Sequence, residues 1–301
     1  MSKWHFKKGE LATSSLALHV DAHNGPITPW QNTGIRVGDA AQGISLPSDM
    51  QERVIVIAAG DSVTVTYEET SVELSGRQNV FAGPADVLYL PINTAAEVHG
   101  KARVIIGEAP ATQRKKVQVM RRSEVPILIR GAGRETRQIH NFCMPDTMDA
   151  DRIICVEGIV PAGNWSGVPA HKHDTYIPSV ESALEEIYYF ESAVTRGSSP
   201  VGSSEPFGYF RGYASDDRAF EVDATIHGGD VVLIPHGYHG PVAAAPGYDL
   251  YFFNVMAGSD PVRQWFVTDD PCHGWIRESW ESQNQDPRLP YHSNVNDSGE
   301  R

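Results

Sequence analysis

Two histidines one residue apart, His171 and His173, form the first group in the chain that could bind a metal. Successive side chains of a β-strand point to opposite faces, so on a strand these two imidazoles share one face. Two neutral imidazoles on one face can coordinate the same divalent ion. His171 and His173 are therefore predicted to begin a metal site.

Two adjacent glutamates, Glu185 and Glu186, come next, at the start of an aromatic strand candidate that ends at Phe190. With a period of two residues, Glu186 shares a face with Tyr188 and Phe190, whereas Glu185 points to the other face. A carboxylate oxygen from a neighbouring strand can complete a histidine site. We predict that Glu186 is the third ligand.

The fourth predicted ligand is His239, at the end of residues 229–239, which read GDVVLIPHGYH. This segment has the pattern of a turn, a buried apolar strand and a second turn. Three nitrogens and one oxygen leave positions open for a substrate on a six-coordinate ion, and they suit Zn, Mn, Fe or Ni. A His-x-His pair alone is more often packing or surface decoration, but the apolar-flanked glutamate and this segment favour the metal site.

The arrangement resembles the two motifs of the cupin superfamily, G-x5-H-x-H-x3-4-E and G-x5-P-x-G-x2-H-x3-N. Two features depart from that pattern. Twelve residues, 174–185, separate His173 from Glu186, and only Tyr238 lies between Gly237 and His239. The longer first interval predicts a loop inserted between two strands.

The same segments resemble the family of 5-deoxy-glucuronate isomerases of inositol catabolism. The resemblance extends over residues 171–174, 184–190, 229–239, 245–251, 254–258, Trp265 and 270–275. It implies a cytoplasmic, metal-dependent aldose–ketose isomerase that converts 5-deoxy-glucuronate to 5-dehydro-2-deoxy-gluconate. Such a reaction moves a proton between adjacent carbons through an enediol, and a divalent metal can stabilise the developing charge as a Lewis acid.

An isomerase of this kind needs a general base near the reacting carbon. The candidates are Glu185, if it faces the pocket, Asp174, and Tyr188 acting through a water. The sequence does not rank them.

The sugar acid also needs a cation for its carboxylate and polar side chains for its hydroxyl groups. Each candidate has a plainer interpretation as a solvated surface charge or a packed tyrosine. The substrate-binding candidates are Lys172, Tyr176, Arg211, Tyr213, Tyr251 and Arg263.

The elements around these residues read as short strands separated by turns, about 8 to 12 residues apart, a pattern typical of all-β sandwiches and barrels. Gly60 and Asp61 are predicted to turn the chain between two strands, and short helices are predicted at residues 261–265 and 274–280. We therefore expect an all-β fold with few short helices.

The strands fall into two series that look related. Residues 83–91, GPADVLYLP, echo the segment that precedes His239, but no histidine follows them. We predict two cupin-type jelly-roll barrels. The N-terminal one, residues 1–122, is degenerate and lacks a metal site; the C-terminal one, residues 123–301, carries the metal site and ends in a polar tail.

The composition limits the partners. The chain of 301 residues has 25 basic and 38 acidic residues, a formal net charge of -13, which disfavours nucleic acid and anionic membranes. Its three cysteines, Cys143, Cys155 and Cys272, form no close pair, and no apolar run approaches the ~20 residues of a membrane span. These features fit a cytoplasmic enzyme with a small sugar-acid substrate, and the large β surfaces suggest a homo-oligomer.

Three alternatives stay open. A related uronate ketol-isomerase would share the fold and the metal motif. A cupin metal-dependent dioxygenase would use the same ligands and consume oxygen. A non-catalytic sugar-binding bicupin would lack a complete metal set, whereas one set looks complete here.

Overall fold

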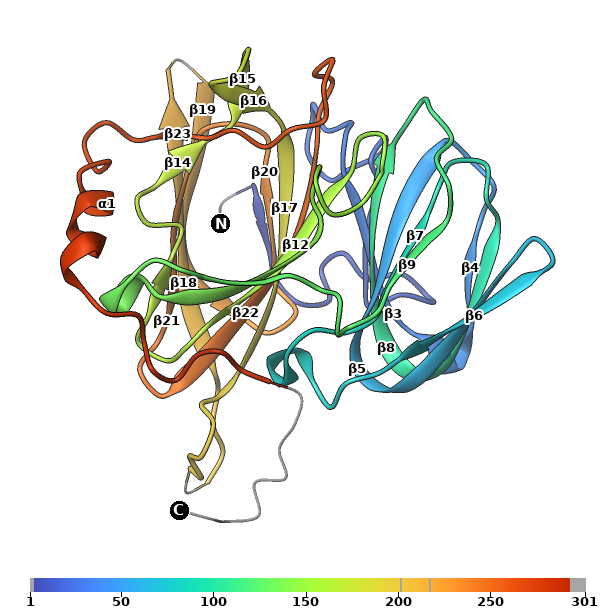
Figure 1. Ribbon diagram of the computed structural model, residues 1–301, viewed down its shortest axis with the longest axis horizontal. Helices are drawn as coiled ribbons and strands as arrows, with labels where there is room; N and C mark the ends of the chain where they lie inside the picture. Colours follow the sequence, from blue (N-terminus) through green and yellow to red (C-terminus); the bar gives the residue numbers. More distant parts are fainter. Residues whose placement is uncertain (1–2, 201, 217, 293–301) are drawn as a thin grey trace.

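The computed structural model describes residues 3–200, 202–216 and 218–292, and its chain folds into two β-bodies that lie side by side (Figure 1). The described residues contain one α-helix, α1 (Ile276–Ser279), and everything else that is regular is strand or short 3-10 helix. The predicted all-β fold is confirmed.

The N-terminal body is an eight-stranded sheet with the order β2-β3-β8-β5-β7-β9, in which β4 also pairs with β8 and β6 with β5. Its long strands β5 and β8 pair along most of their length, and its interior is filled by aliphatic side chains such as Ile55, Val65 and Val104. The strands are β2 (Leu18–Val20), β3 (Gly34–Asp39), β4 (Ile44–Leu46), β5 (Gln51–Tyr67), β6 (Thr70–Ser75), β7 (Val87–Leu90), β8 (Ala96–Pro110) and β9 (Gln118–Met120).

The predicted turn at Gly60 and Asp61 is wrong, because β5 runs through both residues. Register shifts against β8 on either side of Gly60 mark bulges instead. Gly60 has a φ of +129°, and a Cβ there would lie 2.3 Å from the carbonyl oxygen of Lys101, so the position requires glycine.

The C-terminal body has two facing sheets, one of seven strands in the order β1-β20-β17-β22-β12-β11-β10 and one of six that includes β19-β18-β21-β14-β23 and β13. Their inner faces enclose an aromatic core around Phe190, Phe210 and Phe252. The strands are β1 (His5–Phe6), β10 (Ile127–Arg130), β11 (Arg137–Cys143), β12 (Ile154–Val160), β13 (Trp165–Ser166), β14 (His171–Lys172), β17 (Glu185–Val194), β18 (Phe207–Ser215), β19 (Arg218–His227), β20 (Val231–Ile234), β21 (Tyr238–Ala244), β22 (Tyr248–Ala257) and β23 (Thr268–Asp269).

The first strand lies in the second body. β1 pairs with β20, and the Asp230 carboxylate beside β20 accepts a hydrogen bond from the backbone N–H of Lys8 at 2.9 Å and lies 3.0 Å from Nε2 of His5. In Figure 1 the dark blue strand at the start of the described chain lies beside β20 in the C-terminal body. The division at residue 122 stays a prediction. β1 precedes this boundary in sequence but belongs to the sheet of the C-terminal body.

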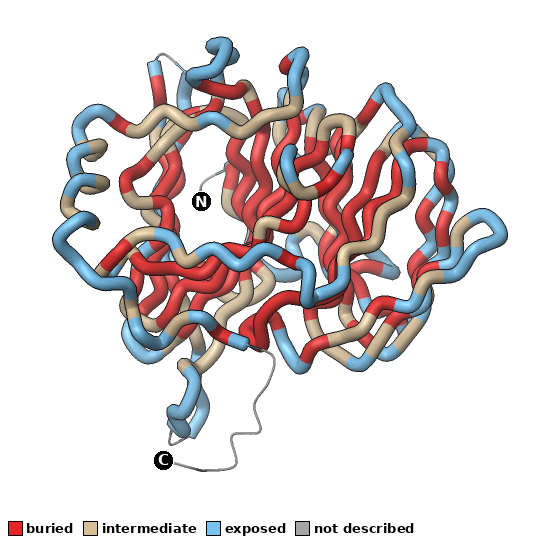
Figure 2. The backbone as a smooth tube through the Cα atoms, viewed as in Figure 1, coloured by how far each residue is buried: buried red, intermediate tan, exposed pale blue. Residues whose placement is uncertain are grey.

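The two bodies share a third apolar core. Outward-facing side chains of the seven-stranded sheet, such as Ile187 and Phe253, pack with Val54, Val56 and Ile105 of the N-terminal sheet. Figure 2 shows buried chain running through both bodies and across their contact. Burial of these apolar side chains stabilises the contact between the two bodies.

A buried ionic network crosses the same contact. Arg77 of the N-terminal body donates two 2.7 Å hydrogen bonds to the carboxylate of Glu157 on β12. The same carboxylate accepts a 2.6 Å hydrogen bond from the hydroxyl of Tyr251, and Nδ1 of His140 lies 2.6 Å from it. Each of these groups is buried, so the network fixes the relative position of the two bodies.

The 174–185 interval contains a hairpin, β15 (Asp174–Ile177) and β16 (Glu181–Ala183), in the place of the predicted loop. The helix predicted at 261–265 is absent, whereas α1 and the following 3-10 turn, η4 (Trp280–Ser282), overlap the one predicted at 274–280. None of the helices in the described residues has the length and hydropathy that a bilayer span requires.

Candidate active site

Three histidines converge at one end of the C-terminal barrel. His171 on β14 and His239 on β21 are directly opposite each other in the antiparallel pair, with ring centroids 4.6 Å apart. His173 follows β14, and its ring centroid lies 4.8 Å from that of His239. One ligand nitrogen from each histidine lies within 4.8 Å of the other two. Three imidazole nitrogens thus converge on one point.

Glu186 approaches the same point from the opposite sheet. Its Oε2 lies 3.0 Å from Nε2 of His173 and 3.1 Å from Nε2 of His239. The side chain is 1% exposed, because Glu186 alternates inward with Tyr188 and Phe190 along β17. The long interval before Glu186 therefore does not displace it from the histidines.

Backbone carbonyls orient the three imidazoles in the same way. Nδ1 of His171, His173 and His239 lies 3.3 to 3.4 Å from the carbonyl oxygens of Pro169, Leu184 and Gly237, in that order. An Nδ1–H that donates to a carbonyl leaves the lone pair of Nε2 free for a metal.

The electrostatics of the cluster suit a cation. Burial, with His239 and His173 nearby, lowers the pKa of His171 well below its ordinary value, so its imidazole is neutral at pH 7. Burial by itself would raise the pKa of Glu186, but the contacts with His173 and His239 outweigh it and lower the pKa, so the carboxylate is ionised. For His173 the contact with Glu186 outweighs burial and raises the pKa.

One buried atom tests whether a metal fits. Nε2 of His239 has no hydrogen-bond partner among the described residues, although it is 3.1 Å from Glu186. A buried polar atom without a partner is costly, and a divalent cation between the imidazoles and the carboxylate would satisfy it. The residues present can therefore hold a divalent metal ion.

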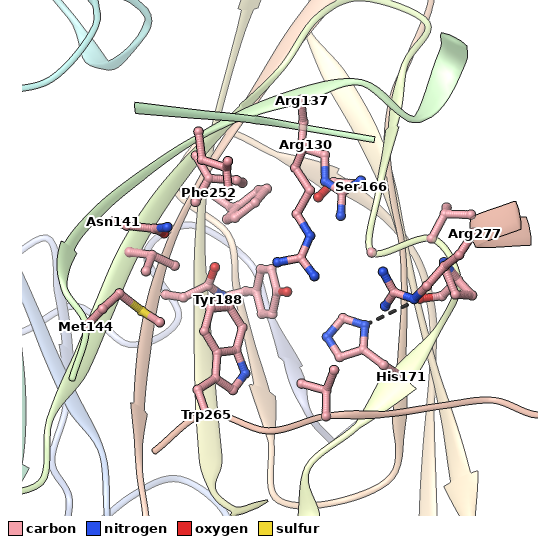
Figure 3. Close-up of a pocket in the computed structure, with 18 residues that line it drawn as sticks. Arg130, Arg137, Asn141, Met144, Ser166, His171, Tyr188, Phe252, Trp265 and Arg277 are labelled. Atoms are coloured by element: carbon pink, nitrogen blue, oxygen red, sulfur yellow. Dashed lines mark hydrogen bonds between the residues drawn. The ribbon is translucent and has the colours of Figure 1, made fainter. Parts of the chain in front are cut away.

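A cavity of about 200 Å³ opens beside His171 in the same barrel. Its walls combine apolar and polar side chains, with Ile139, Val156 and Phe252 among the apolar ones. Figure 3 shows Arg130 and Arg137 above the cavity, Arg277 at the right, and His171, Tyr188 and Trp265 below. The polar side chains that line it are Arg130, Arg137, Asn141, Ser166, His171, Tyr188, Asn254, Trp265 and Arg277.

Of the three predicted bases, the structure places only Tyr188 in this cavity. Glu185 faces the N-terminal body, where its carboxylate accepts hydrogen bonds from the backbone N–H groups of Gln31 and Asn32, the shortest 2.7 Å. The inward orientation considered for Glu185 is therefore wrong, because Glu186 takes the inward position of β17.

Asp174 is held in a network outside the cavity. Its carboxylate accepts hydrogen bonds from Nζ of Lys172 at 2.9 Å, from Oγ of Ser215 at 2.6 Å and from the backbone N–H of Gly237 at 2.8 Å. Lys172 also pairs with Glu181 at 2.7 Å. These contacts tie the hairpin to the barrel, and they leave neither Asp174 nor Lys172 directed at a substrate in the cavity.

The other predicted substrate contacts also lie outside the cavity. Arg211 is exposed and stacks over the ring of Tyr213, whose hydroxyl donates to Asp270. Tyr176 is 38% exposed on the hairpin. None of these three lines the cavity, so their assignment to the pocket is not supported.

Tyr251 and Arg263 are structural. Tyr251 points to the contact between the two bodies, as described above. The guanidinium of Arg263 donates to the backbone carbonyls of Cys143, Met148 and Ile153 at 2.8 to 2.9 Å, which anchors the segment near residue 263 to these loops. Neither lines the cavity.

The sequence did not identify the three arginines that do line the cavity. Arg130 and Arg137 are far in sequence from the histidine motifs, and Arg277 follows the last strand. The usable signal was the pair of strand candidates that flank the turn at residues 131–136. Antiparallel pairing across that turn places Arg130 opposite Arg137 on one face.

Comparisons with known proteins identify a family. The model of the KduI/IolB family matches residues 6–276. A protein of Geobacillus kaustophilus named 5-deoxy-glucuronate isomerase is 37% identical over 255 residues, 83% of this chain and 87% of the relative. A Bacillus subtilis protein of the same name is 34% identical over 248 residues, 81% of this chain and 87% of the relative.

Two solved structures are similar to this chain. The crystal structure of an IolB-like protein from Salmonella typhimurium has a TM-score of 0.79 and 34% identity, and the match covers 91% of this chain and 98% of that one. Bacillus subtilis oxalate decarboxylase has a TM-score of 0.56 at 12% identity over 89% of this chain and 80% of that one, a likeness of fold alone. The predicted cupin-type fold is confirmed.

Proposed function

The chain belongs to the KduI/IolB family, and we propose that it is a 5-deoxy-glucuronate isomerase. It would convert 5-deoxy-glucuronate to 5-dehydro-2-deoxy-gluconate in inositol catabolism. The observation that carries the proposal is the convergence of His171, His173, Glu186 and His239 beside a cavity lined by cationic side chains.

The proposed cofactor is a divalent metal, Zn, Mn, Fe or Ni, held by those four side chains. When bound, it would supply a Lewis acid that stabilises negative charge on the oxygens of the two carbons that exchange a proton. The three imidazoles and one carboxylate suit each of these metals.

Tyr188 is the proposed proton carrier. Its hydroxyl lies in the cavity on the same face of β17 as Glu186. Burial, together with the charge of Glu186, raises the pKa of Tyr188 well above its ordinary value, so the hydroxyl is protonated at pH 7. Tyr188 can therefore donate its proton to the substrate carbonyl oxygen as that oxygen becomes an enediol hydroxyl, and in the same step it regains a proton from the neighbouring carbon through one water molecule.

The apolar side chains of the cavity keep bulk water away from the reacting carbons. Ile139, Val156 and Phe252 form this wall, and Phe252 lies over Gly158, where a Cβ would come within 2.2 Å of the ring. Exclusion of water strengthens the electrostatic interactions between the substrate and the polar groups of the site.

The test combines metal analysis with an assay. Protein purified without chelator should contain about one divalent ion per chain and should convert 5-deoxy-glucuronate without oxygen consumption. Conversion that depends on oxygen uptake would instead support a dioxygenase. Metal-loaded protein that converts nothing would contradict the proposal.

A homo-oligomer in the cytoplasm completes the proposal. The hairpin of β15 and β16 exposes Tyr176, Ile177 and Val180, with exposed fractions of 38%, 43% and 55%, which suits a surface that contacts a second copy. Light scattering of the purified chain tests the oligomer; a monomer at all concentrations would contradict it.

A further inference from the structure

We propose that Arg137, assisted by Arg130 and Arg277, is the carboxylate-recognition site that makes this enzyme specific for sugar acids. The inference rests on the proposed function and deepens it, since it names the side chains that select the substrate class. The three guanidinium groups line the same cavity as His171, as Figure 3 shows.

The strand register places two of these arginines together. Arg130 on β10 is directly opposite Arg137 on β11, and Leu128 is opposite Ile139 two residues further along. All four side chains line the cavity, so the pair faces inward. Like charges directly opposite on neighbouring strands repel each other, and such a pair is stabilised when an anion lies between them.

Within the described residues, neither Arg130 nor Arg137 forms an ion pair with a carboxylate, whereas Arg277 binds both oxygens of Asp269. Arg137 is only 6% exposed, its Nη1 donates to the carbonyl of Glu135 at 3.0 Å, and its buried Nε has no partner there. A buried guanidinium whose N–H has no acceptor can bind an anion such as a carboxylate.

The charge state agrees with this geometry. Burial, followed by repulsion from Arg130 and Arg277, lowers the pKa of Arg137 to about 9, so the group is still charged at pH 7. A bound carboxylate would offset both effects.

The orientation of the arginines is set before any ligand binds. The guanidinium carbons of Arg137 and Arg277 lie 5.6 and 5.5 Å from the centre of the Trp280 ring. Gly131 makes room in the turn, since a Cβ there would lie 2.7 Å from Nη1 of Arg137. Preorganised donors bind a carboxylate with less loss of conformational entropy.

The positions of the arginines and the histidines define one orientation for a bound sugar acid. His171 and the arginines border one cavity of about 200 Å³, so a six-carbon uronate can place its carboxylate at the arginines and its carbonyl end at the histidines. Neutral aldoses would leave the charges of Arg130 and Arg137 unpaired, and the site rejects them for that reason.

The experiment compares Arg137→Gln with Arg134→Gln, a matched control on an exposed arginine of the same turn that does not line the cavity. Metal content, kcat and KM for 5-deoxy-glucuronate are measured, together with the rise in Tm on adding D-glucuronate or D-glucose. We expect Arg137→Gln to keep its metal, to raise KM about 100-fold with a smaller change in kcat, and to lose the glucuronate shift. Arg134→Gln should behave as wild type, and glucose should shift none of the proteins.

The outcomes separate the two proposals. If wild type converts 5-deoxy-glucuronate and Arg137→Gln retains its KM and its glucuronate shift, the carboxylate site is wrong and the isomerase stands. If wild type converts nothing, yet glucuronate stabilises it and not Arg137→Gln, the carboxylate site stands and the isomerase falls. Should Arg137→Gln fail to fold, Arg130→Gln on the exposed side of the pair takes its place with the same expected results.

Discussion

Glu185 and Glu186 are neighbours in the chain, but their carboxylates lie on opposite faces of β17 and bind different partners. Glu186 contacts His173 and His239 inside the barrel. Glu185 accepts hydrogen bonds from the backbone of Gln31 and Asn32 in the N-terminal body. One strand therefore contributes to the histidine cluster with one face and to the contact between the bodies with the other.

Glu186→Gln should lose the metal. The amide cannot supply the charged oxygen that balances a divalent ion among three neutral imidazoles, so metal affinity should fall about 100-fold or more. Elemental analysis after dialysis against a weak chelator measures this loss, and isomerase activity should disappear with the metal. A fully loaded Glu186→Gln protein would remove Glu186 from the ligand set.

Glu185→Gln is the matched variant one residue away. It should keep its metal and most of its activity. Burial outweighs the hydrogen bonds from Gln31 and Asn32 and raises the pKa of Glu185, so a neutral amide that still accepts a hydrogen bond should change the unfolding free energy by less than about 1 kcal/mol. Urea denaturation of the metal-loaded protein measures the difference. Loss of activity with the fold and metal intact would instead support Glu185 as the general base.

Tyr188→Phe should lower kcat without a comparable change in KM. The variant keeps the ring that packs between Phe190 and Phe210, so stability and metal content should change little. Without the hydroxyl, kcat should fall about 10²- to 10³-fold with little change in KM, as for the loss of a proton carrier. Steady-state kinetics at saturating metal test this, and an unchanged kcat would assign the proton transfer to another group.

The parts of the site that obey local periodicity were predictable from the sequence. His171, His173, Glu186 and His239 follow from alternation along strands and from turn residues, and the structure brings these four together. Periodicity also predicts that Tyr251 points away from Phe252. Tyr251 accordingly donates to Glu157 at the contact between the two bodies and does not line the cavity.

The arginines required information that a single sequence does not contain. Arg277 reaches the cavity only because residues 270–282 fold back over the open edge of the barrel, beside β10 and β11. Similarly, the pairing of β1 with β20 joins residues more than 220 positions apart. Short strands carry too little pattern to specify such long-range partners.

Glu157 should make the protein sensitive to acid. Burial by itself would raise the pKa of this carboxyl above its ordinary value of 4.5, but Arg77 and His140 outweigh burial and hold the pKa well below that value. Because the folded state holds the proton less tightly than the unfolded state, the stabilisation is complete above about pH 4.5 and is lost as the pH falls below it.

Glu157→Gln should therefore change both the level and the slope of stability. At pH 7 the unfolding free energy should drop by about 3–5 kcal/mol, since Arg77 keeps a buried charge without a partner. Between pH 4.5 and 3 the variant should lose less additional stability than wild type, which urea denaturation at several pH values measures. Combining Arg77→Met with Glu157→Leu should recover part of the loss, because no unpaired charge then remains at the contact between the two bodies. Equal acid slopes in wild type and Glu157→Gln would show that this network does not set the acid limit.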